Sequence, residues 1–110
     1  MKHILIAIAT ASIAMTAVTA QAADLKKGQE LLVKGNCAAC HGEGMNKPVV
    51  AEYAKLAGQH ADYLYAALKA YKVTNNPNIG RSNAIMAGQA AQFSDRDLKD
   101  MAAYIASLPG

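Results

Sequence analysis

Two cysteines and one histidine lie within a single five-residue segment of this sequence. Cys37 and Cys40 are separated by two alanines, and His41 follows directly. On a helical turn, positions i, i+3 and i+4 share one face, so both thiols and the imidazole can reach the same planar ligand. The segment therefore places two nucleophilic sulfur atoms and one metal-binding nitrogen on a single surface.

The spacing C-x-x-C-H is the pattern of covalent c-type haem attachment. In that chemistry the thiols of Cys37 and Cys40 each add to one vinyl group and become thioethers, and a ring nitrogen of His41 becomes an axial ligand of the iron. The sequence therefore predicts one covalently bound haem c.

The same residues would also fit a thioredoxin-like redox pair, half of a zinc site, or a chance occurrence. A redox pair calls for a βαβ context, which the sequence lacks, and a zinc site calls for two further ligands. Only His60 is left to supply one of them after residue 41. A disulfide between Cys37 and Cys40 would close a very small loop and constrain little of the unfolded chain.

The beginning of the chain has the composition of a secretory signal peptide. A short basic start precedes mostly apolar residues up to position 20, and Ala20-Gln21-Ala22 is a small-x-small cleavage site. An uncleaved anchor is the alternative, because the apolar run is close to the minimum length that spans a bilayer. We predict a cleaved signal peptide over 1–22, a periplasmic domain over 23–110, and no stable membrane span after cleavage.

Length and composition allow one small domain with a thin core. The chain has 110 residues, of which 53% are hydrophobic, but it contains one Phe and no Trp. Small domains often need a disulfide, a metal or a cofactor to complete their interior, and haem is the candidate here. The net charge is only +3 and shows no clustered basic patch, so we expect no nucleic-acid partner.

Hydrophobic periodicity predicts an all-α domain of about four to five helices. Asp24 is a suitable N-cap for the first helix, and Ser94 with Asp97 resembles a capping box before the last one. Residues 73–82 are rich in Asn and contain Pro and Gly, which predicts a loop. The predicted helices cover residues 25–34, 49–56, 61–71 and 94–108.

The order of short motifs along the chain resembles that of class I c-type cytochromes, specifically the small monohaem periplasmic ones. The motifs are Gly28, C-A-A-C-H at 37–41, L-A-G-Q at 56–59, R-S-N-A-I-M at 81–86 and A-A-Y-I-A-S-L at 102–108. The resemblance covers essentially all of residues 23–110. It implies the small class I cytochrome c fold and a soluble electron carrier, not an enzyme, that cycles between Fe(II) and Fe(III) and exchanges electrons with redox partner proteins.

The resemblance also implies the second axial ligand and two accessory residues. Met86 would bind the iron opposite His41, from a loop that reaches the other haem face. Arg81 and Asn83 would contact the haem propionates or the Met86 loop, although a solvated loop arginine is the plainer interpretation of Arg81. His60 is the rival sixth ligand and would give bis-histidine ligation.

Two more expectations follow from the resemblance. Gly28 in the first helix would let the last helix approach closely near Met101 and Tyr104. Relatives often have Pro at the position of Ala54, which leaves open which backbone carbonyl supports His41.

Two competing functional classes share these features with the carrier. One is an enzyme or gas sensor whose sixth iron position opens to a small molecule, and the second is a fixed haem subunit of a larger redox complex. An intact Met86 segment favours the carrier.

Overall fold

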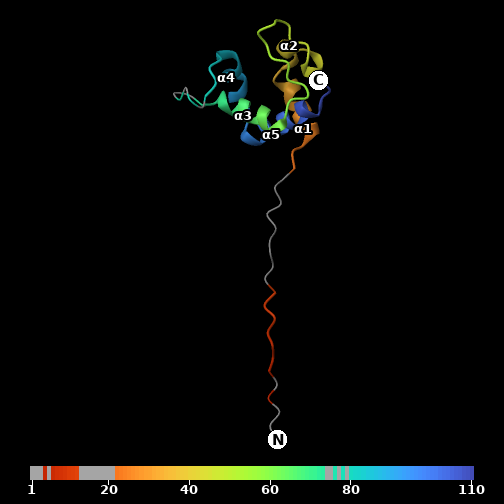
Figure 1. The fold of residues 1–110 in the computed structure, drawn as a ribbon, viewed down its shortest axis with the longest axis vertical. Helices are drawn as coiled ribbons and strands as arrows, with labels where there is room; N and C mark the ends of the chain where they lie inside the picture. Colours follow the sequence, from red (N-terminus) through yellow and green to blue (C-terminus); the bar gives the residue numbers. More distant parts are fainter. Residues whose placement is uncertain (1–3, 5, 13–21, 74–75, 77, 79) are drawn as a thin grey trace.

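A computed structural model describes residues 4, 6–12, 22–73, 76, 78 and 80–110. Within these residues the chain forms five α-helices and one short 3₁₀ helix, and no strand (Figure 1). The elements are α1 (Leu25–Lys34), α2 (Ala38–His41), η1 (Glu43–Met45), α3 (Ala61–Ala70), α4 (Ala84–Ala91) and α5 (Asp95–Ser107). The all-α prediction of about four to five helices is confirmed.

The predicted signal peptide lies partly outside the described residues, because residues 1–3, 5 and 13–21 are not among them. Residues 6–12 form no helix and are exposed. No helix in the described part of the chain is both long and apolar enough to cross a membrane. Cleavage after residue 22 therefore stays a prediction.

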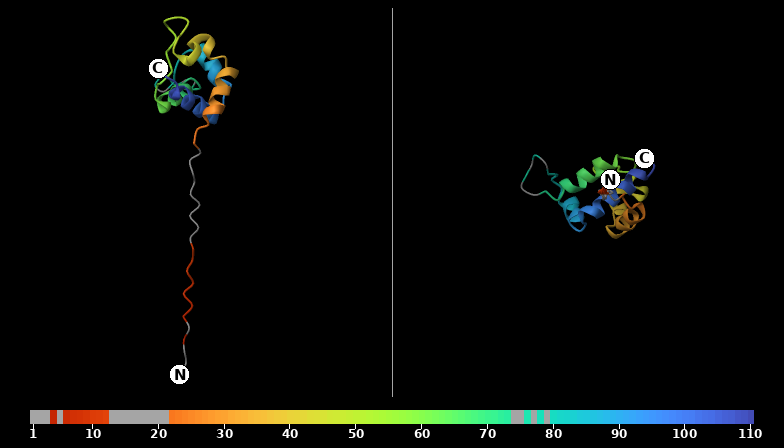
Figure 2. Two further views of the ribbon diagram at one scale, coloured as in Figure 1. Left: turned by 90° about the vertical axis from the view of Figure 1, so that its right-hand side faces the viewer. Right: turned by 90° about the horizontal axis from the view of Figure 1, so that it is seen from below.

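α1 and α5 pack closely against each other at Gly28 (Figure 2). A Cβ atom at Gly28 would lie 2.1 Å from the carbonyl oxygen of Asp100 and 2.9 Å from Cβ of Tyr104. No side chain larger than hydrogen fits there, so the expected role of Gly28 is confirmed. Its backbone neighbour on α5 is Asp100 rather than Met101.

A buried carboxylate fastens the start of α1 to α5. Asp100 is only 3% exposed, accepts a hydrogen bond from the backbone N–H of Asp24 at 2.9 Å, and pairs with Arg96 at 3.3 Å. The side chain of Asp24 in turn accepts from the backbone N–H of Lys27 at 3.0 Å and caps α1 as predicted. The buried charge is thus partnered on two sides.

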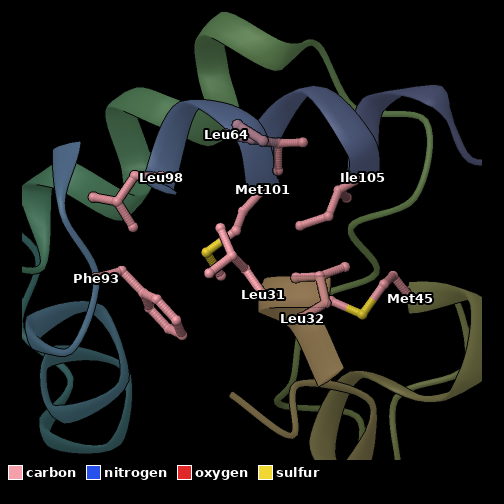
Figure 3. Close-up of a cluster of buried hydrophobic side chains, with 9 residues drawn as sticks. Leu31, Leu32, Met45, Leu64, Phe93, Leu98, Met101 and Ile105 are labelled. Atoms are coloured by element: carbon pink, nitrogen blue, oxygen red, sulfur yellow. The ribbon is translucent and has the colours of Figure 1, made fainter. Parts of the chain in front are cut away.

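Side chains from α1, α3 and α5, together with Met45 of η1 and Phe93 after α4, form the hydrophobic core (Figure 3). Leu31 and Met101 face each other between α1 and α5, and Met45 lies beside Leu32. Leu98 alone among the large buried side chains described has a relative exposure below 2%. The core is therefore thin, as its composition predicts. Its members are Leu31, Leu32, Met45, Leu64, Phe93, Leu98, Met101, Ala102 and Ile105.

The capping box before the last helix is confirmed. The hydroxyl of Ser94 accepts from the backbone N–H of Asp97 at 3.1 Å, and the carboxylate of Asp97 accepts from the backbone N–H of Ser94 at 3.1 Å. The helix over 61–71 is confirmed as α3, with Tyr71 as its C-cap. The described residues of 73–82 contain no helix, in agreement with the predicted loop.

The predicted helix over 49–56 is wrong, because this segment consists of bends and turns. Backbone donors at both ends of the segment bond to distant carbonyls: Val49 N–H donates to Cys40 at 3.0 Å, and Leu56 N–H to Met45 at 2.8 Å. Val49 is 62% exposed, so no apolar face of a helix would be buried there. Tertiary hydrogen bonding therefore replaces local helix formation.

We expect Gly28→Ala to lower the free energy of unfolding by about 1–3 kcal/mol or more, because the added methyl group overlaps the α5 backbone. Gly88→Ala is the matched control. Gly88 lies within α4, and a Cβ atom there would have no neighbour within 4 Å, so alanine should stabilise by about 0.5–1 kcal/mol. Denaturant unfolding followed by circular dichroism measures both. Equal effects of the two substitutions would contradict the close helix contact.

Candidate functional site

One cavity of about 250 Å³ gathers all six residues that the sequence predicts for the site. They are Cys37, Cys40, His41, Arg81, Asn83 and Met86. The remaining wall includes apolar side chains of the core, among them Leu64, Phe93 and Ile105. His60 is not part of this wall, and it is exposed at the N-terminus of α3. The cavity therefore joins the C-x-x-C-H turn to the Met86 segment and leaves out the rival histidine.

The C-x-x-C-H segment folds as one tight helical turn directly after α1. Gly35 ends α1, and the backbone N–H groups of Cys40 and His41 both donate to the carbonyl of Cys37, at 3.2 and 3.1 Å. Cys37 and Cys40 are half-buried free thiols. Both line the same cavity as the imidazole, as the i, i+3, i+4 spacing predicts.

Burial raises the pKa of the Cys37 thiol above its ordinary value, and a hydrogen bond to its own backbone lowers it by less. Cysteines of thioredoxin-like redox pairs show the opposite shift, toward an easily formed thiolate. The direction of the Cys37 shift thus differs from that of a reactive redox-pair thiolate. No group of three or more potential metal ligands is found in the part of the chain that the structure describes.

The imidazole of His41 is oriented by a backbone carbonyl. Its Nδ1 lies 2.8 Å from the carbonyl oxygen of Ala54, and the residue is only 9% exposed. Because a carbonyl oxygen accepts only, Nδ1 carries the proton and Nε2 keeps a free lone pair. The carbonyl support that the sequence leaves open is thus supplied by Ala54 itself, at the position where relatives often have Pro.

Two glycines allow the chain to turn around this histidine. Gly42 has φ = +83°, and a Cβ atom there would lie 2.0 Å from the carbonyl oxygen of Lys47. Gly58, with φ = +78°, donates its backbone N–H to the carbonyl of Ile105 at 3.1 Å. The loop that carries Ala54 is therefore held between the C-x-x-C-H turn and the end of α5.

Met86 lies just after the predicted loop, in a helix that the sequence analysis does not predict. It is the third residue of α4, it is half-buried, and its side chain contributes to the cavity wall. Asn83 caps this helix, and its Oδ1 accepts from the backbone N–H of Met86 at 3.0 Å. The expected contact between Asn83 and the Met86 segment is therefore present. Hydrophobic periodicity misses α4, although the N-cap preference of asparagine is the signal that marks its start.

Arg81 contacts two tyrosines that the sequence does not single out. Its guanidinium carbon lies 5.7 Å from the ring centroids of both Tyr63 and Tyr71, and Nη2 donates to the hydroxyl of Tyr63 at 3.0 Å. Interaction with Tyr71, and then with Tyr63, raises the pKa of Arg81 above its ordinary value. Arg81 is exposed, but it is held by partners and is not simply a solvated loop arginine.

The residues around the cavity fit a haem group. Two thiols and an imidazole with a free Nε2 come from one short turn, and a methionine thioether comes from a different helix. Imidazole and thioether are the axial donor pair of cytochromes c. The apolar side chains around them match the largely hydrocarbon surface of a porphyrin.

Comparisons with known proteins agree with this chemistry. The family model for cytochrome c matches residues 25–109. Cytochrome c4 of Stutzerimonas stutzeri is 35% identical over 90% of this chain and 48% of its own length. Cytochrome c-554(548) of Halomonas halodenitrificans is 37% identical over 78% of this chain and 98% of its own length. The chain thus spans about half of the cytochrome c4 relative but nearly all of the shorter one.

The fold is also that of a solved cytochrome. The crystal structure of reduced recombinant cytochrome c4 from Pseudomonas stutzeri superposes with a TM-score of 0.69 and 34% sequence identity, over 81% of this chain and 47% of that one. The residues that match the family model include both the C-x-x-C-H turn and Met86. The chain therefore belongs to the cytochrome c family, whose members bind haem c covalently and transfer electrons.

Proposed function

We propose that this chain is a periplasmic electron carrier with one haem c, attached at Cys37 and Cys40 and ligated by His41 and Met86. The observation that supports the proposal best is the single cavity that all four side chains line. When bound, haem c supplies a one-electron Fe(III)/Fe(II) couple. Redox partner proteins, one donor and one acceptor, exchange that electron with the carrier.

The chain's own residues would attach the haem and set the relative stability of Fe(II) and Fe(III). The thiols of Cys37 and Cys40 would hold the haem, each through one carbon–sulfur bond to a vinyl carbon with the thiol proton going to the neighbouring carbon. His41 would offer Nε2 to the iron, because the Ala54 carbonyl accepts a hydrogen bond from Nδ1. Met86 would offer a soft, neutral thioether, a donor that favours Fe(II) over Fe(III) and would exclude small molecules from the iron.

Export of residues 23–110 after removal of 1–22 is part of the same proposal. It is supported by the basic, apolar and small-x-small pattern at the start of the sequence. Attachment of haem through thioethers takes place outside the cytoplasm, where such a leader would deliver the chain. The described residues show no helix able to cross a membrane.

Replacing Met86 by Ala tests the ligation. The oxidised protein should lose its thioether-to-iron charge-transfer band, and the reduced protein should bind carbon monoxide readily at neutral pH. If Met86 binds Fe(II) about tenfold more tightly than Fe(III), its loss lowers the potential by about 59 mV. Absorption spectra and redox titration of the holo-protein measure these changes.

His60→Ala is the matched control, since His60 is exposed and does not line the cavity. It should leave the band, the potential and the resistance to carbon monoxide unchanged. Ready binding of carbon monoxide to the unmutated protein would favour a sensor or enzyme over a carrier. Loss of six-coordination in His60→Ala would assign the sixth position to His60.

The processed protein should have the mass of residues 23–110 plus one haem, with no thiol open to alkylation at Cys37 or Cys40. Intact-mass spectrometry of the periplasmic fraction, before and after treatment with iodoacetamide, measures both quantities. A product that retains residues 1–22 would indicate an uncleaved anchor. A gain of two alkyl groups would refute covalent attachment.

The double variant Cys37→Ser/Cys40→Ser should be largely unfolded when no haem is retained, because the core alone is thin and a cofactor that binds only the native state supplies part of its stability. Far-ultraviolet circular dichroism and thermal melting of the full chain test this. Native-like helix content with a cooperative transition in the haem-free variant would show that the protein core suffices.

A further inference from the structure

The helix that carries Met86 has little hydrophobic anchorage of its own. Within α4 only Ala90 is buried, and Ile85 is 57% exposed. α4 has no buried large side chain comparable to Leu64 of α3 or Met101 of α5. Ile85, Met86 and Ala90 face the cavity, and outside that wall α4 makes little apolar contact with the protein core, so polar contacts are what join the helix to its neighbours.

Arg81 connects the start of α4 to α3. Its backbone N–H donates to the carbonyl of Ala70 at 3.0 Å, and its guanidinium contacts the rings of Tyr63 and Tyr71. The bond from Nη2 to the Tyr63 hydroxyl fixes the guanidinium in place. α3 itself is anchored in the core by Leu64, which is 4% exposed. Arg81 thus ties the chain just before α4 to a firmly packed helix.

The connection reaches Met86 through the helix cap. Asn83 lies two residues after Arg81, and its Oδ1 accepts the backbone N–H of Met86 at 3.0 Å. The cap therefore joins the backbone next to Arg81 to the third residue of α4.

Lys72 connects the opposite end of the same segment to α3. It follows α3 by two residues, and its Nζ donates to the carbonyl of Phe93, which lies two residues beyond α4. Phe93 is 3% exposed and belongs to the core. The two cations therefore hold α4 from both sides: Arg81 before it and Lys72 after it.

We propose that Arg81 and Lys72, here called the α4 clamp, are positioning residues that hold Met86 at the sixth iron position. The proposal rests on the proposed function and adds to it the residues that set how tightly Met86 binds. Hydrogen bonds from charged groups and cation–π contacts make up these polar connections between α4 and the rest of the protein. Arg81 acts through the tyrosines and Asn83, and Lys72 acts through the backbone of Phe93.

Competition by imidazole in the oxidised holo-protein measures how tightly Met86 binds the iron. Imidazole displaces Met86 and abolishes the thioether-to-iron band, so its apparent association constant rises as Met86 is held less tightly. In Arg81→Gln, which loses two cation–π contacts and a charge-assisted hydrogen bond, we expect a rise of about tenfold. Arg81→Lys keeps the charge but not the planar guanidinium, so the association constant of imidazole should rise by about threefold. Lys72→Met should also raise the constant.

Tyr63→Phe separates the clamp from a propionate contact of Arg81. This substitution removes only the hydroxyl that accepts from Nη2 and keeps the ring. The clamp predicts a rise of about threefold in imidazole affinity, because one hydrogen bond is lost. An arginine that acts solely through a haem propionate predicts no change. Since Tyr63 is 52% exposed, the variant should fold even if Arg81→Gln does not.

Arg96→Gln is the matched control for general destabilisation. Arg96 is also a cation, but its contacts are with other residues than those of the α4 clamp: it pairs with Asp100 at 3.3 Å and donates to the carbonyl of Ala22 at 2.5 Å. Its loss should lower the denaturant midpoint for helix unfolding while imidazole affinity and the band stay at parental values. Arg81→Gln should change affinity at denaturant concentrations where the helices are intact.

The outcomes distinguish the clamp from the function on which it rests. A charge-transfer band in the unmutated protein with parental imidazole affinity in Arg81→Gln, Tyr63→Phe and Lys72→Met would overturn the clamp and leave Met86 ligation standing. No band in the unmutated protein would overturn both. If the association constant of imidazole rose equally in the Arg96→Gln control, the effect would come from lower global stability, and the clamp would be overturned.

Discussion

The close contact of α1 and α5 at Gly28 is the constraint on which the rest of the site depends. With a hydrogen atom as its side chain, Gly28 lets α1 meet the α5 backbone at Asp100, and the buried Asp100 carboxylate fastens the start of α1 in place. α1 then ends at Lys34, so the C-x-x-C-H turn begins at a fixed point beside the core. α5 also accepts Gly58 N–H at Ile105, which fixes the loop that supports His41.

The two axial sides of the site are held by different physical means. His41 lies in a turn continuous with α1, is almost fully buried, and bonds to the Ala54 carbonyl in a loop tied to η1 and α5. Met86 lies in a helix that buries one alanine and is joined to α3 by surface cations. Exposed charge-assisted contacts are weaker and more open to solvent than core packing. The methionine side is therefore the one from which a ligand would leave first.

Residue patterns predict the strongly periodic elements and the reactive residues, but not the segments between them. α1 and α5 carry recognisable N-caps, and α1, α3 and α5 each turn apolar residues toward the core, so local signals and tertiary packing agree. In 49–56 they disagree, because the donors of Val49 and Leu56 bond to Cys40 and Met45 across the fold. The alanine-rich sequence of α4 has no apolar stripe and so gives no helical signal by periodicity, yet Asn83 caps a helix there.

The supports of the ligands are mostly backbone groups, which explains why the ligands could be predicted and their supports could not. His41 is oriented by the carbonyl of Ala54, and any residue type would provide that oxygen, so Pro is not required there. Met86 is reached through its own N–H by Asn83, and the end of α4 is held through the carbonyl of Phe93. The residue types in the sequence indicate which atoms can bind a metal, whereas the path of the backbone determines whether those atoms lie close together. In this chain that path is set by the contact of two helices and by the cations that fasten a third.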